Sequence, residues 1–184
     1  MRFLRSIMEM DRSMLAKRLV VALFVVPIIF FVVSCVTQKI VIAWGDSVKY
    51  FLFLKSRDYP EKGDYVVIVT PKEDRFAKGK IITKHVVCSG GDELKIVGLH
   101  YYCCSINSSR LEKCVYLGKA KLHSRKGEPV KPFNPCGTYQ CVIKIPHGKF
   151  FVVNQHPDSY DSRYYGFVSF NGSYRILYVV RPLI

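Results

Sequence analysis

The hydrophobic pattern of the chain changes character near residue 37. Before that point lies one continuous apolar run, "LVVALFVVPIIFFVVSCV" over residues 19–36, without a charged side chain. A run of this length is about the shortest, roughly 18 residues, that crosses the hydrocarbon core of a bilayer as a helix. Pro27 inside the run is expected to kink such a helix without ending it. The pattern therefore predicts one transmembrane helix over residues 19–37.

Charges before this run indicate its orientation. Because basic flanks stay in the cytoplasm, we expect residues 1–18 to be cytoplasmic and the chain after Lys39 to be exported. A cleaved signal peptide is the alternative, since its front end is also basic. The run is longer than an ordinary signal-peptide core of about 7 to 15 residues, and Ser34-Cys35-Val36 is a poor cleavage site. The basic residues before the run are Arg2, Arg5, Arg12, Lys17 and Arg18.

Beyond residue 38 the pattern becomes one of short apolar runs separated by turn-forming residues, which is typical of β-strands. Asn171-Gly172, for example, suits a tight hairpin. No further helix is strongly indicated. The sequence thus predicts a mostly β fold, with a β-rich domain built from residues 38–97 and 141–184. The expected strands are residues 48–54, 65–69, 80–87, 94–97, 141–145, 149–154 and 174–180.

Residues 98–140 have weak periodicity and are expected to form an irregular, disulfide-rich lobe inserted between the two halves of the β domain. The lobe either recognises a partner or covers the β core. Six cysteines follow the apolar run, and an even number in an exported region indicates up to three disulfides of undetermined connectivity. Without a Cys-x-x-Cys pair, zinc is not favoured, and we expect neither a metal nor a cofactor. The six are Cys88, Cys103, Cys104, Cys114, Cys136 and Cys141.

The formal charge of +14 raises nucleic acid as a partner. Of 28 basic and 14 acidic residues, 5 and 2 precede the apolar run, which leaves 23 and 12 in the exported part. These charges are scattered and do not form one basic stripe with aromatic platforms. We therefore expect no nucleic acid partner. Anionic lipid headgroups of the bilayer, or a solvated surface, account better for the charge.

Lys84 lies in an unusual context for a lysine. If residues 80–87 form a strand, Lys84 shares a face with Ile82 and Val86, and the opposite face is not clearly polar either. Burial among apolar groups lowers the pKa of an ammonium group, as a general base near neutral pH requires. The alternative is an edge lysine whose long side chain reaches solvent.

A serine is the ordinary nucleophile beside a lysine base. Ser47 lies 11 residues beyond the apolar run, so it can be at most about 40 Å from the bilayer surface. The alternative is that Gly45-Asp46-Ser47 is only a turn. A competing Cys–His pair would join Cys88 to His85 or His156, but disulfides are the default for exported cysteines.

Three stretches together resemble bacterial type I signal peptidases, and more narrowly the signal peptidase-like proteases of conjugative transfer systems. "KHVVCSGGDEL" (84–94) is similar to the family's Lys-Arg-Val-x-Gly-x-Pro-Gly-Asp box. "IPHGKFFVVNQHPDSYDSRYYGFV" (145–168) is similar to its Val-Pro-x-Gly-x-x-Phe-Val segment followed by Asn-x-x-x-Ser-x-Asp-Ser-Arg-Tyr-x-Gly. "SVKYFLFLKSRDYPEKGDYVVI" (47–68) is similar, more loosely, to its serine box followed by Gly-Asp and a strand.

The resemblance implies a signal peptidase-like β domain and a catalytic pair, with Ser47 as nucleophile and Lys84 as general base. It also implies that Ser159 orients the lysine and that a charged pair braces the site. The supporting residues carried over in this way are Ser159, Asp161, Ser162 and Arg163.

The chain departs from the family pattern at several positions. Val48-Lys49-Tyr50 replaces the usual proline after the serine. Gly45 stands where general signal peptidases place a hydroxyl for the oxyanion hole, so backbone N–H groups remain as donors. Cys88 and Gln155 also replace family residues. These differences favour a specialised enzyme with a narrow substrate.

The resemblance implies a single-pass serine endopeptidase of the bacterial inner membrane, with a cytoplasmic N-terminus and a periplasmic catalytic domain. Its expected substrate is an exported precursor, the pilin of a conjugative transfer system, and other conjugation or secretion channel proteins are further partners. An acyl-enzyme would be released by water, or by an amine to give a cyclic product. The alternatives are a general signal peptidase and a non-catalytic, disulfide-rich channel component.

Overall fold

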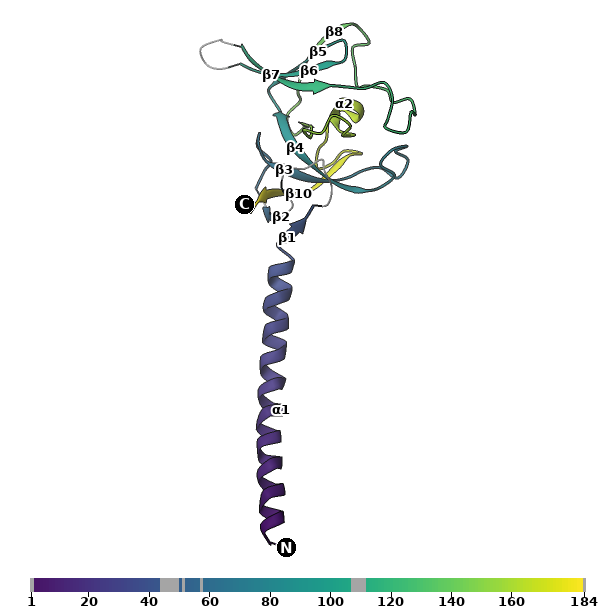
Figure 1. The fold of residues 1–184 in the computed structure, drawn as a ribbon. Helices are drawn as coiled ribbons and strands as arrows, with labels where there is room; N and C mark the ends of the chain where they lie inside the picture. Colours follow the sequence, from purple (N-terminus) through teal and green to yellow (C-terminus); the bar gives the residue numbers. More distant parts are fainter. Residues whose placement is uncertain (1, 44–49, 51, 57, 107–111, 184) are drawn as a thin grey trace. The chain divides into compact units, whose positions relative to one another are not determined.

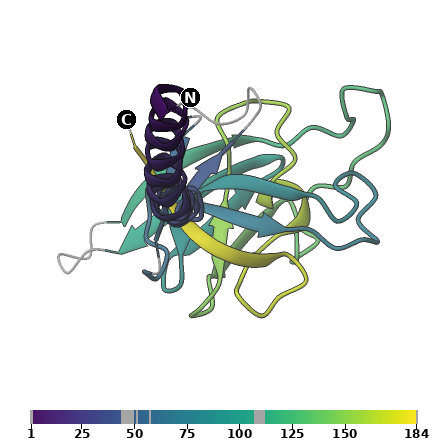
Figure 2. The same ribbon diagram turned by 90° about the horizontal axis from the view of Figure 1, so that it is seen from below.

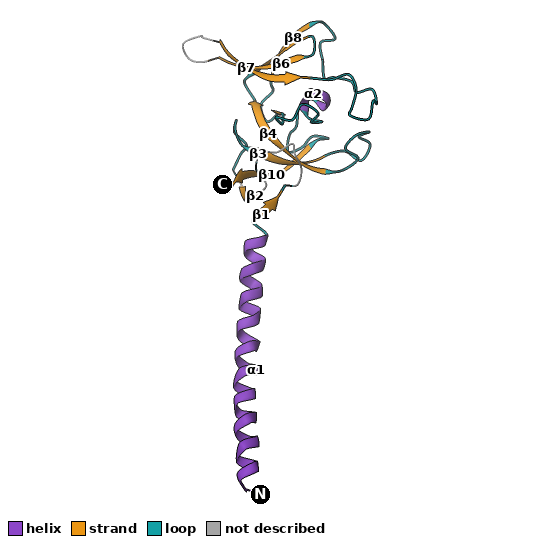
Figure 3. Cartoon of the chain, viewed as in Figure 1, coloured by secondary structure: helices purple, strands orange, loops and turns teal. Residues whose placement is uncertain are grey.

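The structure of the protein is a computed structural model that describes residues 2–43, 50, 52–56, 58–106 and 112–183. The chain forms two compact units, Met1–Ile40 and Val41–Ile184. Figure 1 shows the ribbon, and Figure 3 shows that helix dominates the first unit and strands and loops dominate the second.

The first unit is built around one helix, α1 (Arg2–Thr37), with Pro27 inside it. The stretch Lys17–Cys35 has a mean hydropathy of 2.6, and by length and composition it can cross a membrane. The helix ends where the apolar pattern predicts but begins well before residue 19. The preceding residues are rich in Met, Leu and Arg, which favour helix, so hydropathy alone does not mark the start of the helix.

The second unit contains a six-stranded sheet in the order β1-β2-β10-β3-β4-β9, and all of its paired strands that are described run antiparallel. The last strand of the chain lies between β2 and β3, as the yellow strand beside earlier strands in Figure 2 shows. The strands are β1 (Ile40–Ile42), β2 (Leu52–Ser56), β3 (Tyr65–Val69), β4 (Ile81–Ser89), β9 (Phe150–Val152) and β10 (Arg175–Pro182).

A second, four-stranded antiparallel sheet has the order β7-β6-β5-β8. Its strands are β5 (Glu93–Val97), β6 (His100–Ile106), β7 (Glu112–Lys119) and β8 (Gln140–Lys144). The expectation of irregular structure is wrong for β6 and β7. In β6 the successive residues Cys103 and Cys104 are both buried, so the end of the strand lacks the regular alternation that would reveal it.

Three disulfides join Cys88 to Cys103, Cys104 to Cys114, and Cys136 to Cys141. Cys88 lies on β4 of the first sheet and Cys103 on β6 of the second, so this bond connects the two sheets directly. The mostly β fold with one N-terminal apolar helix and three disulfides is confirmed.

Strand β4 contributes to two different hydrophobic clusters. Val86 packs with Val66 and Phe150, whereas Cys88 packs with Leu94 and Phe151. An irregularity in the pairing of β4 with β9 lies between Val86 and Cys88. A bulge places successive residues out of the regular alternation, so β4 can bury its early residues against one cluster and its last residues against the other.

Candidate active site

Lys84 is almost fully buried, with 5% of its surface exposed. It lies on β4, which is an inner strand of the six-stranded sheet, so the alternative of an edge lysine is wrong. Its Nζ donates a hydrogen bond of 2.8 Å to Oγ of Ser159, which is also buried. Ser47, the nucleophile that the resemblance implies, lies outside the described residues.

The surroundings of Lys84 lower its pKa to about 8. Burial is the largest cause, because it removes water from the ammonium group. The carboxylate of Asp161 opposes this effect, and the guanidinium of Arg163 adds to it. A lysine in this state is partly deprotonated near neutral pH, so it can accept a proton from a hydroxyl.

Asp161 and Arg163 form a buried, two-pronged ion pair. Arg163 donates from Nε to Oδ1 over 2.8 Å and from Nη2 to Oδ2 over 2.7 Å. The exposed fractions of the two side chains are 0% for Asp161 and 3% for Arg163. Asp161 also caps the short helix α2 (Ser162–Tyr165) by accepting from the backbone N–H of Arg163. Such capping explains why a single helical turn forms here.

Ser162 connects this turn to the first sheet. Its hydroxyl oxygen accepts a hydrogen bond of 2.9 Å from the backbone N–H of Val152 on β9, and the side chain is fully buried. The structure thus brings together Lys84 and the four supporting residues named from the sequence. The contacts join residues up to 75 positions apart in the chain.

Asn154 also belongs to this cluster, although it was not among the site residues predicted from the sequence. Its side-chain amide donates to the carbonyl of Thr83 over 3.2 Å and accepts from the N–H of His85 over 3.1 Å. These are the two residues on either side of Lys84, so Asn154 holds β4 at the point where the lysine projects. A polar residue directly after the apolar run "FFVV" is the signal that could have identified it.

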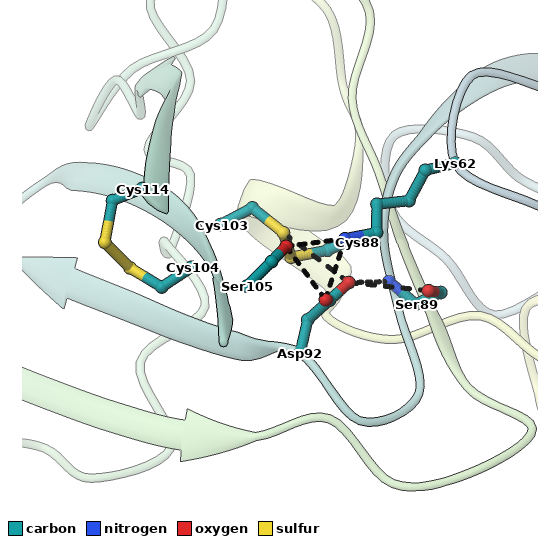
Figure 4. The surroundings of a disulfide bond; sticks show 8 residues. All are labelled: Lys62, Cys88, Ser89, Asp92, Cys103, Cys104, Ser105 and Cys114. Atoms are coloured by element: carbon teal, nitrogen blue, oxygen red, sulfur yellow. Dashed lines mark hydrogen bonds and ion pairs between the residues drawn. A yellow bond between two sulfur atoms is a disulfide. The ribbon is translucent and has the colours of Figure 1, made fainter. Parts of the chain in front are cut away.

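The competing Cys–His arrangement is wrong, because Cys88 is bonded to Cys103. Figure 4 shows that Asp92 lies beside this disulfide. Asp92 accepts hydrogen bonds from Nζ of Lys62 over 2.8 Å and from the backbone N–H of Ser89 over 2.9 Å. The disulfide and Asp92 together hold the end of β4 against the second sheet.

A cavity of about 590 Å³ opens beside the strand that carries Lys84. Its lining includes Val86 and Val87 of β4 and Val115 and Leu117 of β7. Among the described residues that line it, none is acidic, and four are lysine or arginine. These four are Lys62, Lys119, Lys121 and Arg163.

Comparisons with known proteins point to one family. The family model for signal peptidase, peptidase S26, matches residues 13–173. A solved structure of a signal peptidase I from Enterococcus faecalis V583 is similar to the chain with a TM-score of 0.38 and 23% sequence identity. That similarity covers 68% of this chain and 100% of the other. The comparison with curated proteins gave no match.

Proposed function

The chain belongs to the signal peptidase family, peptidase S26, and we propose that it is a membrane-anchored serine endopeptidase with a Ser47–Lys84 catalytic pair. The observation that carries this proposal is the buried hydrogen bond between Lys84 and Ser159, together with a pKa of about 8 for the lysine. A lysine with no catalytic task is rarely buried, because the charged form loses hydration.

In the proposed reaction, Oγ of Ser47 attacks the carbonyl carbon of the scissile peptide while neutral Lys84 takes the hydroxyl proton. The C–N bond then breaks, Lys84 returns the proton to the leaving amine, and an acyl-enzyme ester remains. Water attacks the ester carbonyl while Lys84 takes a proton from it. The ester C–O bond then breaks, Lys84 returns the proton to Oγ of Ser47, and the new carboxyl end is released. The backbone N–H of Ser47 is a donor to the oxyanion.

Membrane anchoring is the second part of the proposal. The apolar stretch Lys17–Cys35 serves as a single-pass anchor in the bacterial inner membrane, with a cytoplasmic N-terminus and the β-rich unit in the periplasm. Support comes from the length and hydropathy of the stretch and from the basic residues before it. An anchored enzyme meets its substrate where exported precursors emerge from the bilayer.

Family membership implies that the substrate is a secreted precursor. We assign to it an extended segment that adds a strand to the sheet, with small residues just before the cut. The cavity between Val86 and Leu117 receives a further part of the precursor. This assignment is supported by the position of the cavity beside β4.

We further propose a narrow substrate, the pilin precursor of a conjugative transfer system. The departures from the general family pattern at Gly45, Val48–Tyr50 and Gln155 support this choice. In such a system an amine can replace water in the second step, which joins the two ends of the product into a ring. A general signal peptidase is the second candidate, since it shares the family.

The test is cleavage of two precursors, a conjugative pilin and an ordinary secreted protein, by membranes that carry the full-length enzyme. Ser47→Ala and Lys84→Ala should abolish cleavage. Lys95→Ala, which changes an exposed lysine on β5, is the matched control and should cleave normally. Cleavage by Ser47→Ala would refute the catalytic pair.

Mass spectrometry of the product separates the finer possibilities. A pilin product lighter than the linear peptide by one water means cyclisation. Cleavage of the secreted protein as fast as the pilin means a general signal peptidase. If the wild-type enzyme cleaves neither precursor and does not react with a serine-directed acylating probe, a non-catalytic channel component becomes the better description.

A further inference from the structure

Ser159 occupies a segment that has neither helix nor strand. The segment begins after β9 ends at Val152 and stops where α2 starts at Ser162. A hydroxyl that must stay 2.8 Å from Lys84 therefore needs support from outside its own segment. The residues on its two sides, Asp158 and Tyr160, provide that support in different ways.

The contact made by Tyr160 is largely protected from solvent. Its hydroxyl donates to Oδ2 of Asp74 over 2.9 Å, and Asp74 is only 9% exposed. The ring of Tyr160 stacks on that of Tyr164, with 5.5 Å between the centroids. A hydrogen bond to a shielded carboxylate is among the stronger ones in proteins.

Asp74 is itself firmly held. Its Oδ1 accepts hydrogen bonds from the backbone N–H groups of Phe76 and Ala77. Its Oδ2 accepts from the hydroxyl of Tyr174 as well as from Tyr160. Burial raises the pKa of Asp74, but these hydrogen bonds together lower it by a larger amount, and the net effect is a decrease. The carboxylate is therefore a fixed, ionised acceptor at neutral pH.

The contact made by Asp158 is weaker. Its carboxylate pairs with Lys121 and Arg125, whose side chains are half or more exposed. Exposed ion pairs contribute little to stability because solvent and salt screen them. The position of Ser159 consequently depends more on Tyr160 than on Asp158.

We propose that Asp74 is a positioning residue of the active site, which acts through Tyr160 to keep the hydroxyl of Ser159 on Lys84. Asp74 lies in the loop between β3 and β4, and Lys84 lies on β4. Two successive residues, Ser159 and Tyr160, are thus bound at two points of the same β3–loop–β4 unit. The role of the lysine as base rests on the proposed function, but the positioning itself does not.

The test uses two substitutions in the full-length enzyme. Tyr160→Phe removes one hydroxyl, and Asp74→Ala removes the acceptor. Each should lower kcat roughly ten- to a hundredfold with little change in KM, since misplacing a catalytic group by about 1 Å has effects of this size. The double variant should be no worse than Asp74→Ala, because both changes remove the same contact.

The pH profile distinguishes positioning from a general loss of stability. A loosened Ser159 segment admits water to Lys84 and raises its pKa. The apparent pKa at which kcat falls on the acidic side, the acidic limb of the pH profile, should therefore move from about 8 toward the ordinary lysine value of 10.5. Thr70→Val is the matched control. Thr70 is buried at the base of the same loop and donates to the carbonyl of Lys80 over 3.1 Å. It should change stability without moving the limb.

A second measurement does not depend on catalysis. Titration of labelled lysine by NMR reports the pKa of Lys84 directly, and Tyr160→Phe should raise it. If the wild-type enzyme lacks peptidase activity but this shift is seen, the proposed function fails and the positioning role stands. If Tyr160→Phe and Asp74→Ala leave both the limb and the Lys84 titration unchanged, the positioning role is overturned.

Discussion

The guanidinium of Arg163 donates from Nη1 to the carbonyl oxygen of Lys119, 3.2 Å away at the end of β7. The same group is bound to Asp161, which lies two residues from Ser159. Arg163 therefore connects the segment that holds Lys84 to the second sheet. Gly118, which precedes Lys119, has a φ of +108°, and a Cβ there would lie 2.9 Å from Nη1 of Arg163.

Gly118→Ala should destabilise the protein and lower its activity. The methyl group would displace the guanidinium, and the positive φ adds strain of about 1 to 2 kcal/mol. Gly127→Ala is the control, because Gly127 also has a positive φ, of +77°, but an added Cβ would meet nothing within 4 Å. Urea unfolding of the detergent-solubilised protein measures both. Equal losses at the two positions would mean that the contact with Arg163 is unimportant.

Arg163→Met should be among the most damaging single substitutions. It leaves the fully buried carboxylate of Asp161 without its partner, and breaking a buried pair in this way costs roughly 3 to 5 kcal/mol. The control is Arg181→Met, which breaks exposed pairs with Asp58 and Asp64 and should cost about 1 kcal/mol or less. Similar unfolding midpoints for the two variants would contradict the structural role of the pair.

Activity should rise with pH through about 8, following the deprotonation of Lys84. Below this value the lysine is protonated and cannot accept the proton of the nucleophile. The measurement is kcat between about pH 6 and 10, which should show a single acidic limb. Lys84→Arg should be inactive throughout, because an arginine stays charged. If kcat instead fell as pH rose over this range, a lysine base would be excluded.

Lys84→Met should raise stability at pH 7 while it abolishes activity. Below pH 8 the lysine is charged in both the folded and the unfolded chain, so the fold carries the full cost of the buried charge. As pH rises from 8 to 10.5 only the folded state has lost its proton, and the wild-type protein gains stability.

The free energy of unfolding of Lys84→Met should therefore exceed that of the wild type by on the order of 3 kcal/mol at pH 7. This difference should shrink as pH rises toward 10.5. Urea unfolding at pH 7 and at a pH near 10 measures this change. Lys95→Met, at an exposed position of β5, should show no such trend. If Lys84→Met were less stable than the wild type at both pH values, the predicted stabilising effect of the substitution would be contradicted.

Local patterns in the sequence determined much of the fold. The apolar run before residue 37 identified the helix that can cross a membrane. Short apolar runs between turn-forming residues predicted most strands of the first sheet, and the same pattern suggested that Lys84 lies among apolar neighbours. These inferences succeed because strand and helix periodicity is set by the nearest residues along the chain. They fail for β6, where the buried neighbours Cys103 and Cys104 interrupt the alternation.

Tertiary structure alone decided which distant residues meet. The pairing of six cysteines, the place of Asn154 beside Thr83 and His85, and the contact between Asp74 and Tyr160 could not be obtained from spacing. The resemblance to a family named Ser159 as a partner of Lys84, and packing supplied the distance between them. The sequence thus determined most of the segments that become helix or strand and named the polar residues that we propose carry the chemistry. The contacts across 75 or more residues depended on how the sheets pack, because side-chain partners in a folded chain are chosen by proximity in space.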